Sequence, residues 1–146
     1  MSALEDSWAL VTATVGAVEL GLGRWLASNH SLVLSDYRAL TVLTRSPDRE
    51  LRISELANRL GLKQSSATRL VERLEDKGLV FRDACPEDGR GVYAVVTPQG
   101  IALTEELRTG YDEKLTELLT EHASSAPGAT REAIRGAFHT AGDQFS

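Results

Sequence analysis

Five side chains within nine residues could together read the edges of nucleic-acid bases: Ser65, Ser66, Thr68, Arg69 and Arg73. A guanidinium can bond bidentately to guanine, and a Ser or Thr hydroxyl can bond to bases or phosphates. On a helix over residues 64–77, these side chains would lie on one side, since a helix repeats every 3.6 residues. The pattern therefore predicts a helix whose polar face enters a groove of double-stranded DNA.

This helix must be positioned by its apolar face and by the segment before it. Residues 53–60 predict a second short helix, capped by Ser54. Gly61 can adopt the left-handed conformation that ends a helix before a sharp turn. Lys77-Gly78 is a typical helix end. The apolar positions of the two helices are Ile53, Leu56, Ala57, Leu60, Ala67, Leu70, Val71 and Leu74. The arrangement is that of a helix-turn-helix, although a structural helical hairpin with a solvated polar face would give the same periodicity.

A predicted β-hairpin follows directly and favours the DNA-binding interpretation. Residues 79–82 and 92–97 are rich in β-branched and aromatic side chains, with a Pro- and Gly-rich turn at 86–91. Arg90 could enter the neighbouring minor groove, with Asp88 holding its guanidinium, and Arg82 could contact a phosphate. Asp88 and Arg90 are also ordinary turn residues.

The flanking segments predict helices. Apolar residues alternate at spacings of four and three from Leu4 to Trp25, and a stripe of this length calls for a covering surface such as a partner chain. Ser35-Asp36 predicts the start of a helix that ends at Ser46-Pro47-Asp48. A further helix is expected from Pro98 to about residue 122, and a last one over 134–145.

The net charge of −5 argues against a strongly basic nucleic-acid binder. Its distribution is uneven, however, because residues 49–90 hold nine Lys or Arg against eight Asp or Glu. Solvated charges more than about 10 Å away are screened at ordinary salt, so the local balance matters most for phosphate contact. The acidic total nevertheless supports an alternative, a winged-helix protein-interaction module without DNA binding.

Taken together, these segments resemble the MarR family of winged-helix transcription regulators. The resemblance spans nearly the whole chain and is most specific in SELANRLGL (54–62), TRLVERLEDKGLV (68–80) and EDGRGVYAVVTPQG (87–100). It implies a mainly α fold with a small β-hairpin wing, that is, a winged helix-turn-helix with helical dimerisation extensions. It also implies a homodimeric repressor that binds pseudo-palindromic operators in double-stranded DNA and releases them when a small aromatic or phenolic effector binds.

Residue by residue, the resemblance places Ser65, Ser66, Thr68 and Arg69 at groove-facing positions and Arg73 at a phosphate contact. Asp88 and Arg90 match the family's Asp-x-Arg wing motif. Lys63 stands where Ser often caps the recognition helix, so the cap passes to Ser65 or is missing. The full expected DNA-binding set is Arg52, Ser54, Gln64, Ser65, Ser66, Thr68, Arg69, Arg73, Arg82, Asp88 and Arg90.

We divide the chain into a helical dimerisation region, residues 1–30 and 98–146, and a winged helix-turn-helix, residues 31–97. The uncharged stretch around residues 9–19 is too short to span a bilayer, and the acidic start is unlike a secretory signal. The sequence therefore predicts a cytoplasmic protein with no membrane partner.

Other chemistry has weaker support. Cys85 could make the protein a redox-sensing regulator, but Asp83 and Glu87 beside it disfavour a thiolate. His30, His122 and His139 lack metal-ligand spacing, so neither a metal nor a cofactor is expected. No nucleophile–base pair or phosphate-binding glycine loop indicates an enzyme. Four aromatic residues could line an effector pocket, although aromatic residues at helical spacing more often pack in a core or interface: Trp8, Trp25, Tyr37 and Tyr111.

Overall fold

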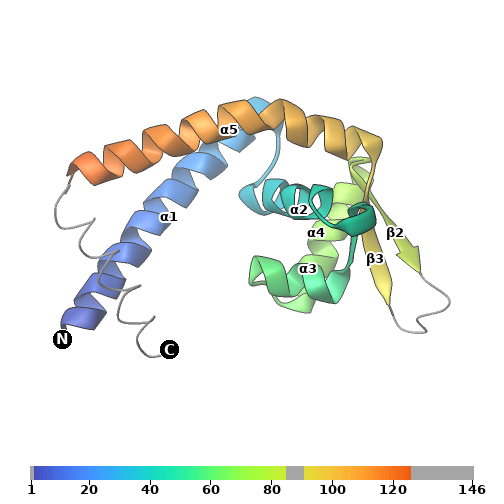
Figure 1. Ribbon diagram of the computed structural model, residues 1–146, viewed down its shortest axis with the longest axis horizontal. Coiled ribbons are helices and arrows are strands. Elements are labelled where there is room, and N and C mark those ends of the chain that lie inside the picture. The colour runs from blue at the N-terminus through green and yellow to red at the C-terminus, as the bar shows by residue number, and fades with distance from the viewer. Residues whose placement is uncertain (1, 85–90, 126–146) are drawn as a thin grey trace. The chain divides into compact units, whose positions relative to one another are not determined.

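The computed structural model describes residues 2–84 and 91–125, which form a mainly helical protein with one small sheet (Figure 1). The described elements are, in order, α1 (Ala3–His30), α2 (Leu34–Thr44), a 3₁₀ turn (Pro47–Arg49), β1 (Glu50–Arg52), α3 (Ile53–Leu60), α4 (Gln64–Asp76), β2 (Val80–Ala84), β3 (Val92–Val96) and α5 (Pro98–Ser125). The predicted last helix over 134–145 lies outside the described residues. The winged-helix fold class expected from the sequence is confirmed.

The chain forms two compact units. The winged-helix unit is Ser31–Thr109, and the end-helix unit comprises residues 1–30 and 110–146. The winged-helix unit thus extends past residue 97 into the first turns of α5. The reason is local packing, because Gly100, Thr104 and Leu107 are all buried.

The sheet has three antiparallel strands in the order β1-β3-β2. The sequence predicted only the β2–β3 hairpin and missed β1. Three residues are too few to show the alternation that marks a strand, so β1 is specified by pairing with β3, which sets Leu51 opposite Ala94. Both residues are buried, so the additional strand closes one edge of the core.

The core of the winged-helix unit joins the predicted apolar faces of α3 and α4 to leucines of α2. Leu40, Leu43, Leu56 and Leu74 are fully buried. The remaining apolar positions of α4 (Ala67, Leu70 and Val71) are buried with them, which confirms the predicted inner face of this helix. Burial of a Leu side chain contributes roughly 1.5–3 kcal/mol, so these contacts dominate the attachment of α4.

The turn between α3 and α4 agrees with the sequence prediction. Gly61 is left-handed at φ 67°, and the N–H of Leu62 donates to the carbonyl of Ala57 at 2.9 Å. This pattern satisfies the last carbonyls of α3 and redirects the chain sharply. Gly61 therefore fixes where α4 begins.

The predicted helix caps require correction. Helix α2 begins at Leu34, so Ser35 is not its cap; instead Asp36 accepts the N–H of Val33 at 3.2 Å. Helix α3 begins at Ile53, which places Ser54 inside the first turn. Lys63 occupies the cap position of α4 without a side-chain hydrogen bond, so this helix lacks a side-chain cap. The buried Asp36 fixes the start of α2, and the pairing of β1 with β3 fixes the start of α3. These contacts outweigh a local side-chain cap, which contributes about 1 kcal/mol.

In the end-helix unit, α1 packs closely against the second part of α5. A Cβ at Gly21 would lie 2.6 Å from Leu118, and one at Gly110 would lie 2.9 Å from the Trp25 ring. Both glycines thus allow close approach of the two helices.

The predicted apolar stripe of α1 is only partly covered. Val11, Val18 and Leu22 are buried, whereas Trp8 and Val15 keep 56% and 48% of their surface exposed. Helix α1 is long enough to cross a membrane, and an 18-residue window within it reaches a mean hydropathy of 1.2. The shorter uncharged stretch around residues 9–19 did not indicate this property. Long apolar helices of soluble proteins share this property, and α1 carries Glu19 and Arg24 within it.

Candidate DNA-binding surface

The polar face of α4 is exposed as the sequence predicted. Gln64, Ser65, Ser66 and Arg69 are exposed, and Thr68 is half-buried with its hydroxyl donating to the carbonyl of Gln64 at 3.0 Å. Arg69 makes no hydrogen bond or ion pair with the described residues. This helix face is therefore available to a ligand outside the chain.

A hollow of about 220 Å³ lies where α3 and α4 begin beside the sheet. The N–H groups of a first helical turn lack intrahelical partners and attract anions. The hollow brings together five of the predicted DNA-binding residues: Arg52, Ser54, Gln64, Thr68 and Arg82. Ile53, Gly91 and Val92 complete its wall. Its lining offers guanidinium, hydroxyl and amide donors to an anion.

Arg52 is held in this hollow by a residue that the sequence analysis missed. Its Nε donates to the Tyr93 hydroxyl at 3.1 Å, and its guanidinium lies 5.7 Å from the centre of the Tyr93 ring. Both contacts orient a flexible cation before any ligand arrives. The pairing of β1 with β3 places Arg52 opposite Tyr93, so only the unpredicted strand could have revealed this contact.

Arg82 is tied to α4 by two carboxylates. Its side chain pairs with Glu75 at 2.9 Å and with Glu72 at 3.5 Å, and its backbone N–H donates to Glu75 at 2.9 Å. These hydrogen bonds from Arg82 lower the pKa of Glu75 below its usual value of 4.5. The cluster anchors the start of β2 to α4 and partly neutralises the cation that we expected at a phosphate.

Arg73 makes an internal contact that the sequence did not predict, although 41% of its side-chain surface stays exposed. Its Nε and Nη2 both donate to Oδ1 of the buried Asp36, at 3.0 and 2.6 Å. A buried carboxylate needs a paired cation, so this internal contact engages the guanidinium that the sequence assigned to a phosphate. Arg73 therefore holds α4 to α2.

Several predicted residues lie outside the described residues. They include Asp88 and Arg90 of the wing motif and the redox candidate Cys85. His139 lies outside them as well, and the described residues contain no cluster that could hold a metal ion.

The four aromatic candidates belong to different parts of the chain. Tyr37 is buried in the core of the winged-helix unit. In the end-helix unit, Trp8 is exposed, whereas Trp25 and Tyr111 are half-buried. The Trp25 ring packs on Gly110 and lies 5.3 Å from the ring of His30. Tyr37 thus has the structural role that is typical of an aromatic residue at helical spacing.

Comparisons with known proteins agree with this geometry. The sequence model of the MarR family matches residues 30–91. The chain is 28% identical over 91 residues to the HTH-type transcriptional regulator MhqR of Bacillus subtilis, a match covering 62% of the chain and 61% of that regulator. It is 25% identical over 115 residues to the homoprotocatechuate degradative operon repressor of Escherichia coli, covering 79% and 76% of the two.

A solved structure extends the similarity to most of the chain. Sco3205, a MarR family transcriptional regulator from Streptomyces coelicolor crystallised in complex with DNA, superposes with a TM-score of 0.75. It is 27% identical, over 93% of this chain and 89% of that one. The relatives are regulators and not enzymes. The sequence match, the exposed polar face of α4 and the sheet order together assign the chain to the MarR family of winged-helix transcriptional regulators.

Proposed function

We propose that this transcriptional regulator binds a pseudo-palindromic operator as a homodimer and acts as a repressor. One observation carries the proposal: α4 exposes Gln64, Ser65, Ser66 and Arg69 while its apolar face is buried. A helix with one fixed face and one polar face can enter a major groove without disturbing its own core. Dimer half-sites would then lie about 34–36 Å apart.

The roles of the residues follow from their chemistry. Arg69, with no partner among the described residues, reads a guanine, and Ser65 and Ser66 bond to neighbouring bases or phosphates. The hollow beside the sheet receives a backbone phosphate, with Arg52 as its oriented cation. Arg90, held by Asp88, enters the adjacent minor groove, a role that rests on the sequence alone.

A second copy of the chain is the proposed partner of the end-helix unit. Leu4, Trp8 and Val15 expose between 44% and 56% of their surface along one stripe of α1. Covering large apolar side chains by a partner removes this surface from water. The proposed cytoplasmic location fits a protein whose partner is DNA.

Effector control is the remaining part of the proposal. The name of the Escherichia coli relative links it to degradation of homoprotocatechuate, an aromatic compound. We propose a small aromatic or phenolic effector, with Trp8, Trp25 and Tyr111 as candidate contacts. A thermal-shift screen of phenolic acids tests this, because a ligand of the native state raises the melting temperature. A hit that leaves operator affinity unchanged would argue against a role as effector.

The DNA-binding function is tested by selecting bound sequences from random duplexes at a stated salt concentration. Enrichment of a palindrome is expected. Arg69→Ala should then weaken binding about 10- to 100-fold and relax the preference at one base pair, since a bidentate contact contributes about 1–3 kcal/mol.

The control is Arg45→Ala, which removes the same charge from an exposed position after α2. It should leave the base preference unchanged. Failure to enrich any sequence, together with binding that does not weaken as salt rises, would favour the protein-interaction module instead.

A further inference from the structure

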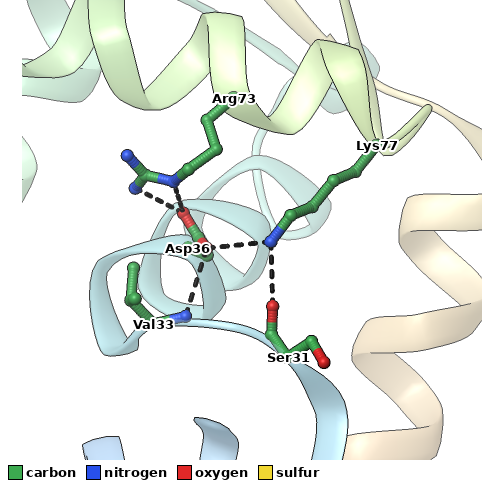
Figure 2. A network of polar contacts seen from close by, with 5 residues as sticks. All are labelled: Ser31, Val33, Asp36, Arg73 and Lys77. Atoms are coloured by element: carbon green, nitrogen blue, oxygen red, sulfur yellow. Dashed lines mark hydrogen bonds and ion pairs between the residues drawn. The ribbon is translucent and has the colours of Figure 1, made fainter.

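Asp36 is the one fully buried acidic residue among those that the structure describes. Its Oδ1 accepts both donors of Arg73, at 3.0 and 2.6 Å, and its Oδ2 accepts the N–H of Val33 at 3.2 Å (Figure 2). The Lys77 ammonium lies 3.7 Å from Oδ2. Arg73 of α4 and Lys77, the residue that directly follows this helix, therefore converge on one carboxylate of α2.

The same group of contacts includes the segment that follows α1. Lys77 Nζ also donates to the carbonyl of Ser31 at 2.9 Å, and Ser31 comes directly after the last residue of α1 (Figure 2). Ser31 has a positive φ of 54°, which is unusual for a residue other than Gly. We name the set Ser31, Val33, Asp36, Arg73 and Lys77 the Asp36 cluster.

Directional contacts explain what this cluster adds to the apolar core. Burial of leucines attaches α4 strongly, but the hydrophobic effect has no preferred direction. Charge-assisted hydrogen bonds from a planar guanidinium are directional, and a buried carboxylate cannot lose its cation without a large cost. Contacts at Arg73 and Lys77 therefore restrict both rotation and sliding of α4 against the start of α2.

We propose that Asp36 is a positioning residue for operator recognition: it holds α4 in a fixed orientation relative to the segment through which the chain leaves α1. This inference rests on the proposed function. In a dimer, the orientation of α4 against that segment helps to decide whether two recognition helices reach successive half-sites together.

The proposal separates two kinds of binding. One α4 needs only its own exposed face to bind a single half-site. Binding of a palindrome gains from the second helix only when both are held at the correct spacing, because effective concentration falls when the connection is loose. Loss of the Asp36 cluster should therefore weaken palindrome binding far more than half-site binding.

The test compares Asp36→Asn and Arg73→Lys with the wild type. Asn is close to isosteric with Asp but removes the charge. Lys keeps the charge of Arg but cannot form the two parallel hydrogen bonds of a planar guanidinium. Asp48→Asn is the matched control, since it changes the charge equally at an exposed position in the turn after α2. Far-UV circular dichroism and stoichiometric titration correct each affinity for the folded, active fraction.

Dissociation constants are measured at one salt concentration on the selected palindrome, on a duplex with one half-site, and on palindromes with altered spacers. Asp36→Asn should bind the palindrome about tenfold or more weakly than the wild type, but the half-site less than about threefold more weakly. It should also lose the preference of the wild type for one spacer length. Arg73→Lys should show the same pattern more weakly, and provides the test if Asp36→Asn does not fold. Asp48→Asn should match the wild type.

Equal losses on both duplexes would overturn the proposal, because they would indicate only a smaller active fraction. Unchanged affinities and spacer preference would overturn it as well. Failure of the proposed function looks different: the wild type itself would not distinguish the palindrome from random DNA, which would also remove the basis of this inference.

Discussion

Replacement of Gly100 by Ala should destabilise the winged-helix unit, although Ala is the better helix former. Gly100 is buried in the first turn of α5. A Cβ there would overlap the carbonyl oxygen of Leu79 and lie 2.7 Å from Cγ2 of Val96. The same oxygen accepts the N–H of Thr97 at 3.0 Å. The methyl group would therefore press on backbone that cannot move without weakening this hydrogen bond.

The size of the effect follows from three contributions. Forcing an extra methyl group into a packed site costs about 1–3 kcal/mol. A weakened backbone hydrogen bond costs about 1 kcal/mol more, whereas the helix propensity of Ala returns about 1 kcal/mol. We expect a net loss of about 1–3 kcal/mol in the free energy of unfolding, a large share of a typical 5–15 kcal/mol.

Urea unfolding followed by far-UV circular dichroism measures this loss, at one protomer concentration because dimerisation affects stability. The control is Gly16→Ala in α1, where a Cβ meets no atom within 4 Å. It should gain about 0.4–1 kcal/mol. A Gly100→Ala protein as stable as the wild type would refute the reasoning, because it would mean that α5 does not pack this closely on Leu79.

Three further predictions concern the recognition helix and the sheet. Lys63→Ser should supply the missing cap of α4 and raise unfolding free energy by about 1 kcal/mol; an unchanged value would contradict the observed helix start. Because the pKa of Glu75 is lower in the folded state, its carboxylate stabilises the fold above pH 4.5, and this contribution disappears as pH falls through the folded pKa. As the pH falls below 4.5, the unfolding free energy measured by urea titration should therefore decrease less in Glu75→Gln than in the wild type. The same decrease in both proteins would argue against the Arg82 contact. Tyr93→Phe removes the hydroxyl partner of Arg52 and should weaken operator binding about two- to fivefold without altering base preference, as measured by fluorescence anisotropy.

Local rules were sufficient for much of this protein. The period of the apolar residues predicted α4 and its buried face, and Gly61 predicted the turn before it, because helical periodicity and left-handed backbone depend on neighbours in sequence. The same reasoning predicted the β2–β3 hairpin and the exposure of Ser65 and Arg69. The exposed polar face of α4 could therefore be predicted from sequence alone.

Only the tertiary structure decided which charged residues act inside the protein. Arg73 looked like any exposed cation of α4, but its carboxylate partner lies 37 residues earlier, and Arg52 finds Tyr93 41 residues later. Strand β1 is likewise defined by a partner strand that follows two helices. Periodicity shows which face of a helix is polar. Which polar groups meet depends on how distant segments pack, and that packing paired Arg73 with Asp36 and left the Arg69 side chain exposed.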